Sequence, residues 1–360
     1  MMKRILSLLL PLLMLSSFVA CGGGGDTENT DTNTDGWYVI DSEVDFDETK
    51  VSDKRKLLAM TDQGNDEIIV IDLGAKDLTS ESAIVWRWSI KTRGDLEYAN
   101  TCRSRLDDVR LRNVPAWGGD IVCMTSSSGM VAVVSYPTGE CLFNANAAGY
   151  GPHSIEVLPS GLVAVACSGN GNSKNADIRI YSASYKTDPY YYSLPLSSAH
   201  GVLWDPETEL LWALGHTELR AYQIGGTRTE PTLIPVEEKT ISFGSGGHDL
   251  SVNFNNNDLM WITYSGVCLY SKSQEKIIRT YDGIRWINTG GVKSINTYAD
   301  GTTVMTVAKS GPAKADHNTN TIWIFSYRQN AEGAWEYVHK WVEFPGREFY
   351  KVRIFDSAYT

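Results

Sequence analysis

The feature that most constrains the fold is a unit of four strand-like segments that recurs along the chain. Apolar segments open at His153, His200, His248 and Lys293, at intervals of 47, 48 and 45 residues. Each is followed by a polar turn, a second apolar segment, a third segment that ends on an aromatic residue and a looser fourth segment. Runs rich in Val, Ile, Tyr and Trp that alternate with Gly, Asn, Asp and Pro are typical of short strands. Four-stranded units with a period of roughly 40–50 residues indicate β-propeller blades.

Two further units lie at the ends of this repeat. Asp107 opens a copy 46 residues before His153, and Lys351 opens a last copy nine residues before Thr360. Three segments that lack a first strand occur earlier in the chain: Leu57–Thr61, Glu67–Ile71 and Ile84–Ile90. Joining Lys351–Phe355 to them completes a sixth blade and leaves no open sheet edge around the ring. The sequence therefore predicts an all-β fold, a β-propeller of about six four-stranded blades closed by joining the C-terminal strand to N-terminal strands. A β-sandwich is the alternative, but it does not explain the regular period.

The first 21 residues have the composition of a secretory signal. Lys3 and Arg4 precede an apolar run, Ile5–Leu15, which is too short to span a bilayer as a helix. The segment ends in Phe-Val-Ala-Cys at Cys21, which resembles the lipobox of bacterial lipoproteins, although Phe18 stands where Leu is usual. The resemblance implies that residues 1–21 are a lipoprotein signal peptide ending at the lipidated Cys21. An ordinary signal peptide that ends near a cysteine is the alternative.

Residues 22–53 are expected to form a flexible acidic tether. They contain ten acidic residues and a single basic residue, Lys50, and their first half has almost no apolar side chain to bury. Residues 54–360 would then form the propeller domain. An acidic stretch directly after the lipidated cysteine resembles the signals that send some lipoproteins to the cell surface. This implies an outer-membrane lipoprotein exposed at the cell surface, with the periplasmic face as the alternative. Nucleic acid is not expected as a partner, because the sequence offers no basic patch.

Five cysteines follow Cys21, an odd number that cannot pair completely within the chain. Cys123, Cys167 and Cys268 lie inside apolar strand-like runs, where a free thiol packs as a small hydrophobic group. No Cys-x-x-Cys motif occurs, so zinc-ribbon and thioredoxin-like sites are not supported. The cysteines are expected to be core residues.

The strand openings carry a family resemblance. With His153-Ser-Ile-Glu-Val and His200-Gly-Val-Leu-Trp as examples, residues 54–360 are similar to an uncharacterised family of six-bladed propeller lipoproteins. The openings are similar in style to those of streptogramin lyases, and the histidine-bearing rim to that of oligogalacturonate lyases. The signature of WD repeats is absent, because Trp204-Asp205 and Gly215-His216 occur once each and in the wrong places. The resemblance covers a handful of residues in each blade.

The candidate site lies where the first strands of the blades begin. In a propeller these strands line the central channel, so His153, His200 and His248 would occupy equivalent rim positions on three successive blades. Asp107 or Asp108, together with Lys293 and Lys351, would occupy the other three. Six titratable residues at six equivalent positions are not explained by core packing, which selects apolar groups. The alternative is a polar, solvated channel of no catalytic use.

These residue types suggest two kinds of chemistry. Neutral imidazoles that converge can hold a divalent metal, with the histidine set as ligands and Asp107 supplying an oxygen. Lys293, Lys351 and Arg353 could bind a carboxylate or sulfate. The predicted ligand-binding set is His153, His200, His248, Lys293, Lys351, Arg353, Asp107 and Asp108. The histidines His216, His317 and His339 fall off the repeat position and are expected at the surface.

Three functions remain open at this point. The first is binding of a carbohydrate or other small anionic ligand at the propeller mouth. The second is a metal-assisted polysaccharide or uronide lyase, and the third is a protein-interaction scaffold in a surface complex. No serine-hydrolase elbow and no glycine-rich phosphate loop occurs. Fold alone does not choose among the three. Binding is preferred, because no complete catalytic set can be assembled without assuming a metal.

The lipid anchor can be tested directly. We expect the Cys21→Ala protein to lack lipid, because no other residue of the lipobox carries a thiol that can be acylated. Incorporation of labelled fatty acid by expressing cells measures this, with the unchanged protein as the reference. If the Cys21→Ala protein still carries label, the assignment of residues 1–21 is wrong.

Overall fold

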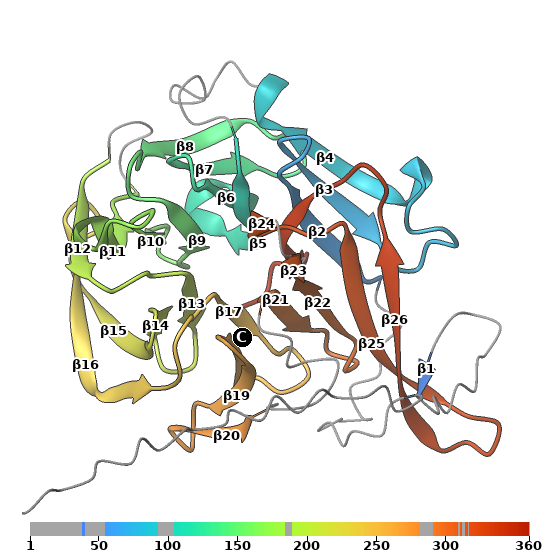
Figure 1. The fold of residues 1–360 in the computed structure, drawn as a ribbon. Coiled ribbons are helices and arrows are strands. Elements are labelled where there is room, and N and C mark those ends of the chain that lie inside the picture. Colours follow the sequence, from blue (N-terminus) through green and yellow to red (C-terminus); the bar gives the residue numbers. More distant parts are fainter. Residues whose placement is uncertain are drawn as a thin grey trace, which may run out of the picture.

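Six four-stranded antiparallel blades form a ring (Figure 1). The structure is a computed structural model, which describes residues 55–92, 104–183, 189–280, 291–308 and 317–359. It also gives the backbone of three short strands, Tyr38–Val39, Ser310–Gly311 and Lys314–Ala315. The predicted all-β propeller of six blades is confirmed. The predicted signal peptide with Cys21, most of the predicted tether, and Cys102 lie outside the described residues.

The strands of each blade follow one another from the channel outward. Blade 1 contains β27 (Phe349–Ile354), β2 (Leu57–Asp62), β3 (Glu67–Asp72) and β4 (Ile84–Ser89). Blade 2 contains β5 (Leu106–Val114), β6 (Gly119–Ser126), β7 (Met130–Ser135) and β8 (Cys141–Asn146). Blade 3 contains β9 (Pro152–Val157), β10 (Val163–Ser168), β11 (Ala176–Tyr181) and β12 (Tyr191–Pro195).

The remaining blades follow the same order. Blade 4 contains β13 (Gly201–Asp205), β14 (Leu210–Leu214), β15 (Glu218–Gly226) and β16 (Pro231–Ser242). Blade 5 contains β17 (Asp249–Val252), β18 (Leu259–Thr263), β19 (Val267–Ser271) and β20 (Lys276–Thr280). Blade 6 contains β21 (Val292–Thr297), β22 (Thr303–Val307), β25 (Thr321–Gln329) and β26 (Trp335–Glu343), with β1 (Tyr38–Val39) added outside β26.

Short elements complete the described chain. Strands β23 (Ser310–Gly311) and β24 (Lys314–Ala315) form a two-stranded hairpin between β22 and β25. Single 3-10 turns occur at Glu81–Ala83, Ile90–Thr92, Pro115–Trp117 and Ser173–Asn175. Among the described residues, no helix has the length and apolar character needed to cross a membrane.

The apolar core is divided into layers between neighbouring blades. In β10, Val163, Val165 and Cys167 pack toward blade 2, whereas Ala164 and Ala166 pack toward blade 4. Successive side chains of a strand point to opposite faces of the sheet, so a strand between two blades must be apolar at consecutive positions. This explains the short continuous apolar runs in the sequence.

The predicted packing of the cysteines is confirmed. Cys123, Cys167 and Cys268 are completely buried and form no disulfide bond. Cys141 is also buried and forms no disulfide bond, and it lies at the edge of the layer between blades 1 and 2. Each thiol packs among apolar side chains, as the sequence predicted for cysteines of the core.

The ring closes through β27, as predicted. This C-terminal strand pairs antiparallel with β2, with Leu58 opposite Ile354 and Met60 opposite Val352. Phe349 and Val352 are completely buried against the apolar layer shared with blade 6. Two ends of the chain therefore share one sheet, and blade 1 has no innermost strand without residues 349–354.

One sequence expectation concerning blade 6 needs correction. His339 was expected at the surface, but it is only 2% exposed. Its ring stacks on Trp323 at a centroid distance of 6.4 Å, because it projects from β26 onto the neighbouring strand β25. In addition, Tyr38–Val39 pair with β26 although they lie inside the predicted flexible tether. A strand edge offers unpaired backbone groups, and this pairing satisfies some of them.

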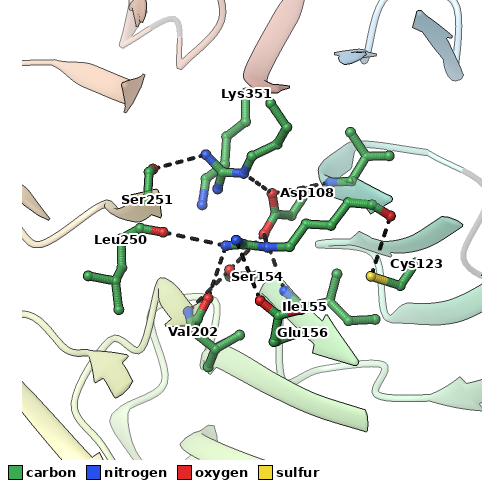
Figure 2. A network of polar contacts seen from close by, with 12 residues as sticks. Asp108, Cys123, Ser154, Ile155, Glu156, Val202, Leu250, Ser251 and Lys351 are labelled. Atoms are coloured by element: carbon green, nitrogen blue, oxygen red, sulfur yellow. Dashed lines mark hydrogen bonds and ion pairs between the residues drawn. The ribbon is translucent and has the colours of Figure 1, made fainter. Parts of the chain in front are cut away.

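Charged side chains fill the middle of the channel (Figure 2). Arg353 of β27 reaches across the channel axis and donates from Nε to Asp108 at 2.7 Å. Its two terminal nitrogens donate to the two carboxylate oxygens of Asp249 at 2.8 and 2.5 Å. Deeper in the channel, Arg112 forms a bidentate ion pair with Glu156 at 2.7 and 2.8 Å. We call these five residues the ion-pair plug.

The far end of the channel is covered by the chain after β27. Arg112 donates to the carbonyl of Ala358 at 3.3 Å, and its guanidinium lies 4.8 Å from the centroid of the Tyr359 ring. The Tyr359 hydroxyl donates to the carbonyl of Val157 at 2.5 Å. The described residues therefore close the channel at this end, and we call the channel above this closed end the cup.

Truncation after Pro345 tests the closure. We expect the shortened protein to lose cooperative thermal unfolding, because blade 1 loses its inner strand while Asp108 and Asp249 lose their partner. A synthetic peptide of residues 346–360, added in excess, should restore part of the transition, since β27 is held by non-covalent contacts. A truncated protein with unchanged thermal stability would contradict closure through β27.

Replacement of Arg353 tests the plug. We expect Arg353→Met to lower the free energy of unfolding by about 3 kcal/mol at pH 7, the lower end of the range for breaking a buried ion pair, because Asp108 keeps Arg110 and Asp249 keeps Lys351. The deficit should shrink as the pH is lowered toward about 4, since protonation neutralises the stranded carboxylates. Urea denaturation at several pH values measures both effects. In the control Arg55→Ala, which removes an exposed ion pair with Asp72, the change should stay below about 1 kcal/mol.

Candidate functional site

The mouth of the cup is formed where the innermost strands begin. We define the mouth by His153, His200, His248, Lys293 and Lys351. The three imidazoles lie side by side, with ring centroids 4.5 Å apart between His153 and His200 and 5.2 Å apart between His200 and His248. All three are partly buried. The structure thus brings together the three histidines that the repeat placed at equivalent positions.

A repeated backbone turn fixes the orientation of each ring. Two residues before each histidine stand Gly151, Ser198 and Gly246, with left-handed φ angles of 61°, 46° and 86°. The carbonyl of this residue lies 2.8, 2.7 and 2.5 Å from Nδ1 of the following histidine. Since a carbonyl only accepts hydrogen bonds, Nδ1 must carry the proton in all three rings. In the neutral ring, Nε2 then carries a lone pair.

The glycines are required where the turn is crowded. A side chain at Gly151 would place its Cβ 2.3 Å from the amide oxygen of Asn170, in addition to adopting a left-handed φ. Gly247, next to Gly246, leaves room for the carbonyl of Gly215, which a Cβ would approach to 2.1 Å. The loops of neighbouring blades therefore pack directly against the turns that aim the histidines.

The three histidines are neutral at pH 7. Partial removal from water lowers the pKa of His153 to about 3 and that of His248 to about 4, and nearby cations act in the same direction. Removal from water also holds the pKa of His200 well below its usual value, and the neighbouring His153 and His248 lower this pKa further. Within the described part of the chain, no hydrogen bond engages Nε2 of these rings. The mouth therefore presents three hydrogen-bond acceptors in a row.

Lys351 is held by internal partners. Its completely buried ammonium donates to the carbonyls of His153 at 3.2 Å and His200 at 3.1 Å, and lies 3.0 Å from a carboxylate oxygen of Asp249. An ammonium has three N–H donors, and all three are engaged by these partners. Lys351 was predicted to bind a ligand, but the structure gives it a supporting position beneath the histidines.

Lys293 is the cation that stays available. Its side chain is 4% exposed, and Nζ lies 5.8 Å from the centroid of the Tyr350 ring. No hydrogen bond or ion pair of this ammonium is found within the described residues. Removal from water, and then the charge of Lys351, lower its pKa to about 8. Of the three predicted cations, Lys293 is the one whose charged group has no hydrogen-bond or ion-pair partner among the described residues, so it can interact with a ligand.

Arg353 and Asp108 belong to the plug rather than to the mouth. Both were predicted to contact a ligand, but each is buried and hydrogen-bonded within the channel. Burial alone would raise the pKa of Asp108, but the charges of Arg353 and Arg110 outweigh it and hold this pKa well below its usual range. The two residues stabilise the floor of the cup.

Asp107 does not behave as an ionised ligand. Gln63 donates to its Oδ1 at 3.1 Å, and burial raises the pKa of Asp107 to about 8. Within the described residues, no three His, Cys, Asp or Glu side chains are arranged to hold a metal ion. The donor set predicted for a metal, the three histidines with Asp107, therefore does not fit one, and no metal-dependent step follows from it.

The sequence contained a signal for the mouth that the repeat comparison missed. Five blades share a positive φ two residues before the leading titratable residue. These positions are Arg105, Gly151, Ser198, Gly246 and Gly291. Glycine recurs at three of them, at a fixed distance from the histidine or lysine. This spacing marks the turn that aims each side chain into the channel mouth.

The expected exposure of His216 and His317 is confirmed.

Solved structures align with the chain at low sequence identity. A chain of the mitotic checkpoint complex aligns at 13% identity over 68% of this chain and 66% of that chain, with a TM-score of 0.46. Hydrazine synthase of Kuenenia stuttgartiensis aligns at 12% identity over 63% of this chain and 64% of that chain, with a TM-score of 0.41. In both cases the chain covers less than two thirds of the other chain. A candidate 6-phosphogluconolactonase from Bacteroides uniformis aligns at 12% identity over 83% of this chain and 99% of that chain, with a TM-score of 0.50, a likeness of fold.

Family comparison agrees with the resemblance expected from the strand openings. No curated protein matches the chain. One family model matches residues 36–342, which include the described strands from β2 to β25 and most of β26. The chain belongs to this family of unknown function, DUF6528.

Proposed function

We propose that this protein is an exported lipoprotein that binds a carbohydrate or other small anionic ligand at the mouth of the propeller. The observation that carries the proposal is the row of three neutral imidazoles beside the ammonium of Lys293, which has no hydrogen-bond or ion-pair partner among the described residues. Hydroxyl groups of a sugar donate to the Nε2 lone pairs, and an anionic group of the ligand is attracted to Lys293. One mouth thus offers acceptors and a cation to the same molecule.

The shape of the site favours a small ligand. The ion-pair plug and the chain around Tyr359 fill the channel below the mouth, so a polymer cannot be threaded through it. Their side chains are already paired, which leaves the floor without a charge that a ligand must satisfy. A ligand would therefore be held at the rim, by groups that reach it from blades 3 to 6.

The proposed location rests on the first 53 residues. A lipobox-like ending at Cys21, followed by an acidic segment, supports attachment to the outer membrane through a lipid, with exposure at the cell surface. Attachment at the periplasmic face is the alternative. In either orientation, the membrane is a partner through the lipid anchor.

Binding is preferred over the two other functions. A metal-assisted lyase requires a metal, and the described histidines with Asp107 do not form a donor set for one. A protein-interaction scaffold in a surface complex agrees with the fold, but no described residue favours it specifically. Neutral acceptors at one mouth, together with a cation that the described residues leave without a partner, are a reason to expect a small-molecule ligand.

The histidine row can be tested with D-glucuronate, a hydroxylated anion, as the probe. We expect His200→Ala in the full-length protein in detergent to weaken binding by about tenfold, because the middle acceptor of the row is lost. The matched control is His216→Ala, an exposed histidine outside the mouth, which should bind like the unchanged protein. Isothermal titration calorimetry measures both affinities. Equal affinities for the two variants would exclude the histidine row as the binding element.

A further inference from the structure

We propose that Lys293 is a nucleophilic amine that takes up the carbonyl carbon of a small anionic aldehyde or ketone as an imine at the mouth. The proposal rests on ligand binding at this mouth and adds a covalent step there. It concerns a residue for which the described part of the chain provides no hydrogen-bond or ion-pair partner, whereas Lys351 and Arg353 have such partners.

The position of Lys293 is unusual for a lysine. A side chain that is 4% exposed ordinarily gives its ammonium a carboxylate or several carbonyl partners. Within the described residues, Lys293 has neither, while Lys351, also buried, uses all three of its donors. An ammonium for which the described residues provide no partner adds little to stability, so a role toward a ligand explains its presence better than a structural role among these residues does.

The surroundings of Lys293 favour the unprotonated amine. The charged group that acts on it is Lys351 of β27, whose charge is fixed by Asp249. Tyr350 of β27 faces it with an aromatic ring, and the imidazoles of His153 and His248 are neutral at pH 7. A lysine that is removed from water beside a second cation is a recognised arrangement for an amine nucleophile. With its pKa lowered to about 8, roughly a tenth of the amine is free at pH 7.

The step balances without a further reagent. The Nζ lone pair attacks the carbonyl carbon, a C–N bond forms, and the carbonyl oxygen becomes the hydroxyl of a carbinolamine. Nitrogen then loses a proton, the C–O bond breaks, and the oxygen leaves as water while C=N forms. Amine and carbonyl compound give imine and water, and nothing is oxidised or reduced.

The same mouth contains a group suited to moving the proton. Among the charged neighbours of His248, Lys293 has the largest effect on the pKa of this imidazole. Nε2 of the neutral ring can accept the proton from nitrogen and return it to the leaving oxygen. Most of Lys293 is the ammonium at pH 7, and this charge attracts a carbonyl compound that also carries an anionic group. The ligand class is therefore a small oxo acid, such as the open-chain form of a sugar acid.

Reductive trapping tests the proposal on the full-length protein in detergent. Glyoxylate, a small anionic aldehyde, is added with sodium cyanoborohydride, which converts an imine to a stable carboxymethyl-lysine that peptide mass spectrometry locates. At pH 7 we expect Lys293 to be modified on the order of a hundredfold faster than a lysine with the ordinary pKa of about 10.4. The exposed Lys76 and Lys174 in the same sample serve as internal comparisons. The rate at Lys293 should level off above about pH 8, whereas the rates at the exposed lysines continue to rise.

The outcomes separate this step from ligand binding. Lys293→Arg cannot form an imine, so it should abolish the fast modification at this position, while binding of D-glucuronate is measured on the unchanged protein. Modification of Lys293 at the rate of Lys76 and Lys174, or a rate that keeps rising to pH 10, would overturn the nucleophile. Fast modification of Lys293 in a protein that does not bind D-glucuronate would support the amine and contradict the hydroxylated anion as ligand. Binding of D-glucuronate without fast modification of Lys293 would support the hydroxylated anion as ligand and overturn the nucleophile.

Discussion

The fold depends on the contact that Arg353 makes across the channel axis. Its guanidinium joins Asp108 of blade 2 to Asp249 of blade 5, and it is delivered by the strand that closes blade 1. Removing such charges from water costs several kcal/mol for each ion, and the cost is offset only when all partners are in place. The contact is therefore satisfied only in the closed ring, which couples formation of the plug to docking of the last strand.

The same strand supplies both the plug and the support of the mouth. Side chains two residues apart on a strand face the same side, so Lys351 and Arg353 both project into the channel from β27. Lys351 binds the carbonyls of His153 and His200, and it shares Asp249 with Arg353. The histidines are thus positioned from two directions, by the left-handed turn before each of them and by a buried ammonium beneath them. Rigidity of this kind reduces the entropy that a ligand must remove on binding.

The repeat allowed the ring and its closure to be predicted, because the strand openings recur at nearly constant intervals. It also placed the three histidines together, since equivalent positions on successive blades are neighbours around a ring. The roles of Lys293, Lys351, Arg353 and Asp108 could not be separated in this way. Whether a charged group is paired or free depends on contacts between blades 1, 2 and 5, and spacing along the chain carries no information about distances across the channel. His339 was misplaced for a related reason, because its burial depends on strand pairing within blade 6.

The direction of β2 has a consequence for how the molecule is displayed. Leu58 pairs with Ile354, at the end of the channel closed by residues 356–359, whereas Asp62 pairs with Phe349 beside the mouth. The polypeptide thus enters its first long strand from the closed side and runs toward the open one. Arg55 and Lys56, the described residues directly before β2, therefore lie on the closed side of the ring, and the three histidines face the opposite side.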